Sequence, residues 1–478
     1  MAEAGSFARV IEERAAQQPG ADALTHEQTR LSYGELERRC NAAAARLSDD
    51  WGIRPGDRVA WLGLNDPAQV VLLFALARIG AILLPLNFRL APPEWDVQLE
   101  HCAPRLVVHD AAWADAARAL AQRHAIDVHS REEVMAAPAS RTVPDHSRPD
   151  APVLLVFTSG TTGTAKAAVH TQANLLANMR IAAQAQEIAP HDRILTVLPL
   201  FHVGGLCIQT LPALFSGAHV ILQPRFAPDA AFDAIERDRP TLTLQVPATM
   251  KALLEHPRWA DANLSSLRAL WAGSSVIPQA LIESFQARGL RVFDVYGSTE
   301  TGPFSIANGI PAAGVEAQVA NVQGDCGEVL VRGPNVVRDY WPAEPACDAE
   351  GWFHTGDLAQ QDAQGRFTIV GRAKELIISG GENIHPAEIE TALSMHESVL
   401  ECAAFGMPDA EWGEVVAVAV VMRADAAAKE SALRAHLEGR IARYKLPRRW
   451  LFVEALPKTA LGKVQRGVLA QAAQAAPR

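Results

Sequence analysis

The chain has 478 residues, which is too long for one hydrophobic core and predicts two or more domains. Hydrophobic residues make up 49% of it, charged residues 21%, and the net charge is -10, so a nucleic-acid-binding surface is not expected. Six scattered cysteines without a CxxC pair favour reduced thiols in a cytoplasmic protein, and we expect neither a signal peptide nor a membrane span.

The first clear structural unit is a strand–helix–strand segment. Residues 58–62 predict a strand, and Asp66 and Pro67 predict the start of the helix that follows. Gly80 predicts the end of that helix, and residues 81–86 predict the next strand. Strands and helices alternate through most of the chain, which indicates an α/β fold.

A loop rich in glycine and hydroxyl groups follows a predicted strand at residues 154–157. It spans residues 158–164 and closes on Lys166. Glycines let the backbone approach a ligand closely, the N–H groups and hydroxyls form a nest for anionic oxygens, and the lysine adds positive charge. The Walker pattern is absent. The loop predicts phosphate binding, although the loop residues alone are also typical of an ordinary polar surface turn.

A second motif, at residues 293–300, ends a predicted short strand with Thr299 and Glu300 side by side. A hydroxyl next to a carboxylate is a pair of hard oxygen ligands, suited to Mg²⁺ that is shared with substrate phosphates. The same residue types also suit the N-cap of a helix, so the motif alone leaves both interpretations open.

Three further segments carry polar groups near glycines. Asp357, in a predicted glycine turn with Arg372 downstream, could accept both hydroxyls of a ribose or simply stabilise the turn. Lys463 lies in a glycine-bearing loop near the C-terminus, where a solvated charge is the ordinary alternative. His202 lies in an apolar run before two glycines and could line a pocket or belong to the core.

The composition changes near residue 372, where a short charged segment precedes a compact α/β pattern of small-domain size. This pattern predicts strands at 376–379, 400–405, 415–421 and 450–453 and helices at 386–395 and 427–442. We therefore predict an N-terminal domain over 1–372 and a C-terminal domain over 373–478.

Taken in order, these motifs resemble the adenylate-forming superfamily, in its branch of acyl- and aryl-acid CoA ligases. The family patterns FTSGTTGxPKG, YGxTE, TGD, GRxKE and P(R/K)TxxGK are matched at residues 157–167, 296–300, 355–357, 371–375 and 457–463. The resemblance covers about residues 6–470, and residues 377–390 are especially similar to the CoA-ligase branch. It implies a large multilayered N-terminal domain (αβαβα-type with a small β-barrel-like part) and a small mobile C-terminal α+β domain.

The resemblance also implies a two-step reaction that uses ATP, Mg²⁺ and coenzyme A. A carboxylate attacks the α-phosphorus of ATP, which gives an acyl-adenylate and pyrophosphate. A thiol then attacks the mixed anhydride, which gives a thioester and AMP. The small domain is expected to rotate between the two steps about a hinge at Lys374.

Site roles follow from positions that match the family. Lys463 is expected to stabilise charge during adenylation, Thr299 to contact the α-phosphate and Glu300 to hold Mg²⁺. His202 is expected to line the acyl pocket and gate the thiol route. The phosphates should be bound by Thr158, Ser159, Gly160, Thr161, Thr162, Gly163 and Lys166, the nucleoside by Gly273, Ser274, Asp294, Tyr296, Gly297, Ser298, Asp357 and Arg372, and CoA by Gly380, Gly381 and Trp412, with Arg448 beside it.

The chain departs from the family pattern at three places. Ala165 and Ala167 flank Lys166 where proline and glycine are usual, which should alter the stiffness of the loop. Gln172 replaces the usual histidine after the loop. The segment 310–326 is short, which puts one edge of the acyl and adenine pocket in doubt.

The acid is left open between an aromatic or phenylpropenoic acid and a short-to-medium aliphatic one. The predicted pocket lining is mainly apolar and has no lysine or arginine: His202, Val203, Gly204, Gly205, Trp271, Ala272, Gly273, Val295, Gly297, Gly302 and Pro303. A stand-alone adenylation enzyme that loads a separate carrier protein is the alternative. A non-catalytic paralogue is disfavoured because the charged motif residues are present. The sequence does not decide the oligomeric state, a homodimer included.

Overall fold

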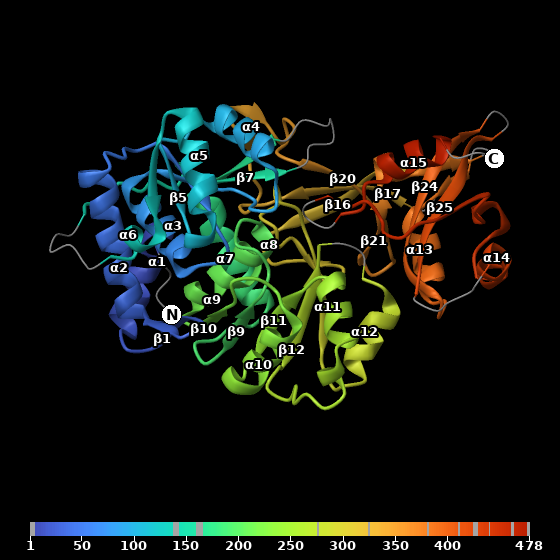
Figure 1. The fold of residues 1–478 in the computed structure, drawn as a ribbon, viewed down its shortest axis with the longest axis horizontal. Coiled ribbons are helices and arrows are strands. Elements are labelled where there is room, and N and C mark those ends of the chain that lie inside the picture. The colour runs from blue at the N-terminus through green and yellow to red at the C-terminus, as the bar shows by residue number, and fades with distance from the viewer. Residues whose placement is uncertain are drawn as a thin grey trace. The chain divides into compact units, whose positions relative to one another are not determined.

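The computed structural model describes residues 5–136, 143–158, 166–274, 277–323, 326–379, 382–409, 412–423, 429–438, 440–459 and 463–475. The chain forms two compact units (Figure 1). The first comprises Met1–Ser275, Ser284–Ala317 and Val331–His354, and the second Val276–Glu283, Gln318–Leu330 and Thr355–Arg478. Both units mix helices and strands, which confirms the predicted α/β class with a large N-terminal and a small C-terminal part.

The first unit contains a nine-stranded sheet over its described residues, in the order β15-β14-β13-β12-β11-β9-β10-β1-β2. Its central strands run parallel, and the edge strands β2, β14 and β15 run antiparallel to their neighbours. The bounds are β1 Asp22–His26, β2 Thr29–Ser32, β9 Arg193–Thr196, β10 His219–Leu222, β11 Leu242–Gln245, β12 Ala269–Gly273, β13 Val292–Tyr296, β14 Ile306–Ala307 and β15 Ile310–Pro311.

A second sheet of the same unit has eight strands within the described ranges, in the order β19-β18-β8-β7-β4-β3-β5-β6. The strands from β7 to β6 are parallel, whereas β8, β18 and β19 continue the sheet antiparallel. The bounds are β3 Arg58–Leu62, β4 Ile82–Pro85, β5 Leu106–His109, β6 Asp127–Ser130, β7 Pro152–Thr158, β8 Lys166–Thr171, β18 Asp339–Tyr340 and β19 Glu344–Pro345.

The predicted strand–helix–strand segment is confirmed as β3, α3 (Pro67–Ile79) and β4. Asp66 caps α3 by accepting a hydrogen bond from the N–H of Ala68 at 2.8 Å. Gly80 ends the helix with φ at 74°, a left-handed conformation that glycine adopts easily. Every residue of α3 is buried, so this helix lies inside the unit rather than at its surface.

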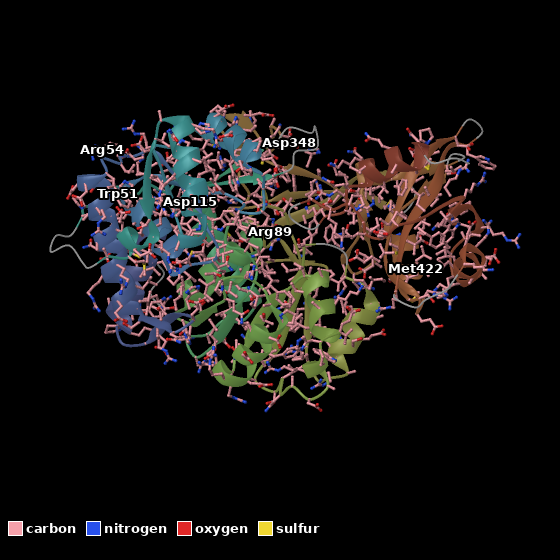
Figure 2. All side chains as sticks on the ribbon, viewed as in Figure 1. Trp51, Arg54, Arg89, Asp115, Asp348 and Met422 are labelled. Carbon is pink, nitrogen blue, oxygen red and sulfur yellow. The ribbon has the colours of Figure 1, made fainter. Side chains whose placement is uncertain are left out.

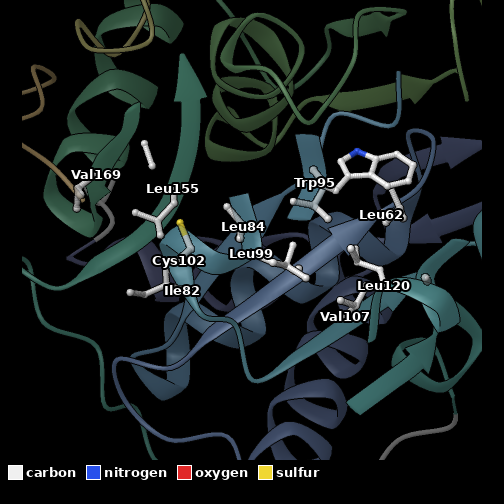
Figure 3. Packing of buried hydrophobic residues seen from close by; sticks show 14 residues of the cluster. Leu62, Ile82, Leu84, Trp95, Leu99, Cys102, Val107, Leu120, Leu155 and Val169 are labelled. Carbon is white, nitrogen blue, oxygen red and sulfur yellow. The ribbon is translucent and has the colours of Figure 1, made fainter. Parts of the chain in front are cut away.

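One face of the eight-stranded sheet is covered by α4 (Pro92–Cys102) and α5 (Ala114–His124). Leu84, Leu99, Leu120 and Leu155 meet between these helices and the strands, as Figure 3 shows. The remaining α-helices of four or more described residues that belong wholly to this unit are α1 Val10–Gln17, α2 Tyr33–Ala45, α6 Arg131–Val134, α7 Gln172–Ala185, α9 Leu211–Ser216, α10 Pro228–Asp238 and α11 Pro247–Leu254.

Charged side chains such as Arg54 and Asp115 lie at the surface of this unit (Figure 2). Of the helices that the structure describes, none combines the length and the apolar character needed to cross a bilayer.

The C-terminal part carries two smaller sheets and α13 (Pro386–Ser394), α14 (Glu430–Leu437) and α15 (Arg466–Ala475). One sheet has the order β16-β17-β20-β21, with β16 Glu316–Gln323, β17 Cys326–Arg332, β20 Phe353–Gln361 and β21 Phe367–Arg372. The other contains β22 Ile377–Ser379, β23 Glu382–Ile384, β24 Val399–Asp409, β25 Gly413–Met422 and β26 Arg449–Phe452. The four strands and the first helix predicted here are therefore confirmed.

The helix predicted over 427–442 is wrong in length, because α14 covers only Glu430–Leu437 among the residues described there. The backbone leaves the helical region at Glu438, where ψ is 125°. Gly439 follows in the sequence, and glycine is a poor helix former. The helix therefore ends before the predicted limit at residue 442.

Candidate active site

The phosphate-loop motif is built on a hairpin of β7 and β8. Thr158 at the end of β7 lies directly opposite Lys166 at the start of β8. The hairpin therefore places both ends of the loop side by side, as a loop that encloses an anion requires. The predicted phosphate ligands Ser159, Gly160, Thr161, Thr162 and Gly163 lie outside the described residues.

Glu300 connects this hairpin to the nine-stranded sheet, because it follows β13. Its side chain is buried, and its Oε1 atom accepts a hydrogen bond from the Thr158 hydroxyl at 3.2 Å. The same oxygen accepts a second hydrogen bond from the Tyr340 hydroxyl at 3.1 Å. Thr299 is buried beside it. The structure thus brings the predicted metal carboxylate to the phosphate hairpin within one unit.

Lys166 is held by two residues that sequence reasoning missed. Its ammonium forms an ion pair with the Glu344 carboxylate and lies 5.0 Å from the centre of the Tyr340 ring. Tyr340 and Glu344 face each other across the short pair β18–β19, and β18 pairs with β8 next to Lys166. No local pattern signals these contacts, because they depend on which strand docks beside β8.

The donor set around Glu300 fits Mg²⁺. The neighbouring groups are hard oxygens, namely one carboxylate and two hydroxyls. Over the described ranges, no three His, Cys, Asp or Glu side chains form a complete metal cage. Magnesium typically uses one or two carboxylates and completes its shell with substrate phosphates and water, so a single buried carboxylate beside a phosphate hairpin suits it.

The predicted adenine edge is formed where β12 and β13 end. A side chain at Gly273 would place its Cβ 2.5 Å from the carbonyl oxygen of Val295, so only glycine allows these strands to approach so closely. Ser274 follows with φ at 74°, a conformation that is uncommon for serine and tends to occur at functional positions.

The next residues along β13 differ in their exposure. Asp294 is exposed to solvent. Tyr296 and Gly297 are half-buried. The Ser298 hydroxyl is buried and has no hydrogen-bond partner within the described part of the chain, whereas its backbone N–H donates to Thr301. A buried hydroxyl without a partner fits a position that a ligand completes.

His202 caps the short helix α8 (Val203–Gly205). Its Nδ1 atom accepts a hydrogen bond from the N–H of Gly204 at 3.0 Å, so this nitrogen carries no proton. The Gly205 backbone is closely packed, because a Cβ there would lie 2.4 Å from the carbonyl oxygens of Leu198 and Pro199. The ring is half-buried, and the hydrogen bond from Gly204 helps to orient it.

Trp271 is the largest of the predicted pocket residues and is buried in an aromatic group. Its ring lies 5.0 Å from that of Phe293 and 5.5 Å from that of Phe304, between centroids. Such tilted pairs fix the planes of the rings. The aromatic group is therefore a tightly packed apolar cluster around the middle of β12.

In the second unit, Asp357 and Arg372 lie opposite each other on β20 and β21. The Arg372 Nε atom is 2.9 Å from Oδ1 of the buried Asp357 carboxylate. The Thr-Gly-Asp motif was predicted as a turn, which is wrong, because Thr355, Gly356 and Asp357 lie inside β20. Gly356 has φ at 68°, which explains the glycine without a turn.

Lys463 lies at the end of a tight backbone loop and is exposed. The N–H of Thr459 donates to the carbonyl of Lys463 at 2.7 Å, and the N–H of Lys463 donates to the Thr459 hydroxyl at 3.2 Å. Three residues later, Arg466 anchors this segment by ion pairs with Glu375 at 3.0 Å and Glu390 at 2.8 Å. Sequence reasoning did not assign Arg466 a role.

The predicted CoA-binding residues are only partly described. Trp412 is exposed, and the Arg448 guanidinium stacks over its ring at 4.4 Å. Lys374, the predicted hinge residue, lies exposed in a short 3₁₀ turn. Gly380 and Gly381 lie outside the described residues.

Two of the departures from the family pattern have a clear structural setting. Ala167 lies in β8, and its methyl group is fully buried in the core cluster of the eight-stranded sheet. Gln172 is buried, and its amide donates to the carbonyl of Ala77 at 2.8 Å. Next to it, Asn174 completes the cap of α7 and donates to the carbonyls of Pro334 and Val336.

Known proteins match this chain over almost its whole length. The AMP-binding enzyme family matches residues 11–341, and the C-terminal domain of AMP-binding enzymes matches residues 388–463. Indoleacetate–CoA ligase from Aromatoleum aromaticum is 41% identical, and feruloyl-CoA synthase from an Amycolatopsis species is 40% identical, with 95% of this chain and 96% of each relative covered.

Solved structures agree with these matches. The o-succinylbenzoate CoA synthetase of Bacillus subtilis, in complex with its acyl-adenylate intermediate, is similar with a TM-score of 0.89 at 28% identity, and 98% of each chain is covered. ATP-bound MatB from Rhodopseudomonas palustris gives the same TM-score at 29% identity, with 97% of this chain and 98% of that chain covered. The chain therefore belongs to the AMP-binding enzyme family, in its branch of acid–CoA ligases.

Proposed function

We propose that this enzyme activates an aromatic monocarboxylic acid of the arylacetic or phenylpropenoic type and transfers it to coenzyme A. The observation that carries the adenylation step is the hydrogen bond between Thr158 and Glu300, which joins the phosphate hairpin to the metal carboxylate. The packed aromatic cluster of Trp271, Phe293 and Phe304, beside the predicted acyl pocket, is consistent with a flat, apolar acid. The names of the indoleacetate and feruloyl relatives support the same class.

The proposed chemistry follows from what each residue can supply. Phosphoryl chemistry needs positioning and charge neutralisation more than covalent catalysis. When bound, Mg²⁺ would neutralise charge on phosphate oxygens, and Glu300 would hold it. Lys166 would bind the outer phosphates, and Thr299 the α-phosphate. Lys463 would stabilise the charge that develops as the acid's carboxylate attacks the α-phosphorus and pyrophosphate leaves.

The nucleoside and thiol roles are also proposals. Asp357 has a buried carboxylate that could accept both ribose hydroxyls while Arg372 fixes its orientation. The Trp412–Arg448 stack offers a flat cationic surface for the nucleotide end of CoA. We place the functional domain boundary at 372–374, and the family segments that end at 341 and begin at 388 flank it. A cytoplasmic location is supported by six cysteines without a disulfide in the described structure.

A substrate panel tests this function. Purified enzyme is incubated with ATP, Mg²⁺ and CoA and with indoleacetic, phenylacetic, ferulic, coumaric, butyric or octanoic acid, and AMP and acyl-CoA are both measured. We expect the highest kcat/KM with an aromatic acid. A clear preference for an aliphatic acid would refute the substrate class, and no AMP with any acid would refute acid activation itself.

The same assay separates the alternative of a carrier-protein loading enzyme. If acid-dependent pyrophosphate exchange occurs but no acyl-CoA forms, the thiol acceptor is a protein rather than CoA. The high identity to two CoA-dependent relatives favours CoA.

A further inference from the structure

The Glu300 carboxylate has an uneven environment. Both described hydrogen bonds to its side chain end on one oxygen, Oε1, and they come from the hydroxyls of Thr158 and Tyr340. The residue is 9% exposed, so these bonds form in a site that is largely shielded from water. A carboxylate held in this way has one oxygen fixed by protein donors and presents the other to a ligand.

Tyr340 is itself held firmly in place. It lies in β18, where it pairs with Ala168 of β8 and with Glu344 of β19. The next residue, Trp341, donates its backbone N–H to the carbonyl of Ala167 at 2.8 Å. Nearby, the N–H of Val337 donates to the backbone carbonyl of Glu300 at 2.8 Å. The segment that carries Tyr340 is therefore fastened both to the phosphate hairpin and to the backbone of Glu300.

We infer that Tyr340 is a positioning residue for the metal carboxylate: its hydroxyl fixes the rotation of Glu300 so that Oε2 faces the Mg²⁺ of the bound nucleotide. This inference rests on the proposed function, in which Glu300 holds that ion. Donors around a ligating carboxylate orient it, and their loss typically weakens metal binding.

The ring and the hydroxyl of Tyr340 have separable tasks. The ring faces the ammonium of Lys166 at 5.0 Å, whereas only the hydroxyl reaches Glu300. The substitution Tyr340→Phe keeps the ring and removes the hydroxyl. It should therefore change metal binding and leave the contribution of Lys166 to nucleotide binding intact.

The experiment measures metal and nucleotide binding without turnover. Mn²⁺ replaces Mg²⁺ and is titrated, with detection by electron paramagnetic resonance, into enzyme saturated with α,β-methylene ATP, which cannot transfer its adenylyl group. We expect Y340F to weaken Mn²⁺ binding by about 10-fold, the lower end for the loss of an outer-shell partner. Affinity for the same nucleotide in EDTA should match that of the wild type. Tyr444→Phe, an exposed tyrosine of the second unit, is the matched control and should change neither value.

The outcomes are distinct. If the wild type binds Mn²⁺ with the nucleotide and Y340F binds it equally well, the inference is wrong while the proposed function stands. If Y340F loses metal-dependent and metal-free binding alike, the role of Tyr340 is structural. If the wild type shows no metal–nucleotide complex, the proposed function fails, and the inference fails with it.

A double-mutant cycle keeps the test valid if Y340F is less stable than the wild type. Glu300→Asp shortens the carboxylate side chain by one methylene and withdraws it from the Tyr340 hydroxyl. In that background Y340F should cause no further loss of Mn²⁺ affinity, because the two residues act as one unit. Additive losses would show that Tyr340 does not act through Glu300.

Discussion

The two charged groups at the centre of the proposed reaction are held in different ways. Glu300 is buried, receives two hydroxyl donors and is tied to the backbone of a neighbouring segment. Lys463 has an exposed side chain, and its segment is held by hydrogen bonds between Lys463 and Thr459 and by the ion pairs of Arg466. The comparison teaches that packing fixes the carboxylate, whereas the lysine side chain lies in solvent, as its proposed action in only the first step requires.

The largest expected effect tests the lysine. Lys463→Ala should slow adenylation by roughly 10²- to 10⁴-fold, the scale for loss of one positioned charge in a transition state. Thermal stability should not change, because the side chain is exposed. Pyrophosphate exchange measures the first step, and thioester formation from a supplied acyl-adenylate measures the second, which should be spared. Equal loss in both steps would contradict the proposal that Lys463 acts in adenylation alone. Lys429→Ala, which changes another exposed lysine, serves as control.

A smaller effect is expected from the anchor behind that loop. Arg466→Met removes the ion pairs with Glu375 and Glu390 and should reduce adenylation roughly 10-fold, since a misplaced catalytic group loses rate steeply with distance. Lys458→Met removes only a half-exposed pair with Glu401 and is the matched control. If both variants behave alike in pyrophosphate exchange, Arg466 has no special part in placing the loop.

The buried core of the first unit is expected to lose folding stability in acid. His170 on β8 is fully buried, its ring nitrogens have no partner among the described residues, and burial lowers its pKa from 6.5 to about 4. The unfolded chain binds this proton more readily. Stability from the neutral ring is therefore complete above pH 6.5 and is lost as pH falls towards 4, by roughly 3 kcal/mol in all.

Urea unfolding of the wild type and of His170→Leu at pH 7 and pH 5 checks this expectation. The variant should lose less stability on acidification than the wild type, because its core has no imidazole to protonate. The exposed His191→Gln should follow the wild type. Identical pH dependence in all three proteins would show that His170 does not contribute.

The smallest effect concerns the ion pair at the phosphate hairpin. Glu344 is more than half exposed, so its pair with Lys166 is worth little energy. Glu344→Gln should free the ammonium for the nucleotide and tighten ATP binding by roughly 2- to 5-fold at low salt, the scale of an exposed pair. Calorimetry at low and high ionic strength measures this, and the gain should shrink with added salt. Weaker ATP binding would instead assign Glu344 a supporting role.

Local signals predicted the fold best. The cap at Asp66, the proline after it and Gly80 define α3 within a few residues of sequence, and the structure has that helix where they place it. The helix predicted over 427–442 was too long, because the backbone leaves the helical region at Glu438. The aspartate motif at 355–357 was read as a turn because a glycine with positive φ serves both turns and irregular strands.

Motifs predicted residues of the candidate site, but they did not predict the residues that hold those side chains in place. Thr158 and Glu300 were recognisable because their neighbours in sequence carry the chemistry. Tyr340 and Glu344 were missed because their role depends on the docking of β18 beside β8, a pairing between residues about 170 positions apart in the sequence. Arg466 was missed for the same reason, since its partners lie on α13 and in the turn after β21.

The side chain of Asn174 sets a rule for building chimeras from this enzyme and its relatives. It caps the first turn of α7 and also donates hydrogen bonds to the carbonyls of Pro334 and Val336, just before the strand that carries Tyr340. An exchanged segment spanning 333–345 would therefore need an asparagine at the recipient's helix start, or two backbone carbonyls would lose their donor, with a cost of about 1–3 kcal/mol expected at the buried Val336. The practical crossover unit is the helix start together with this segment, although about 160 residues separate them.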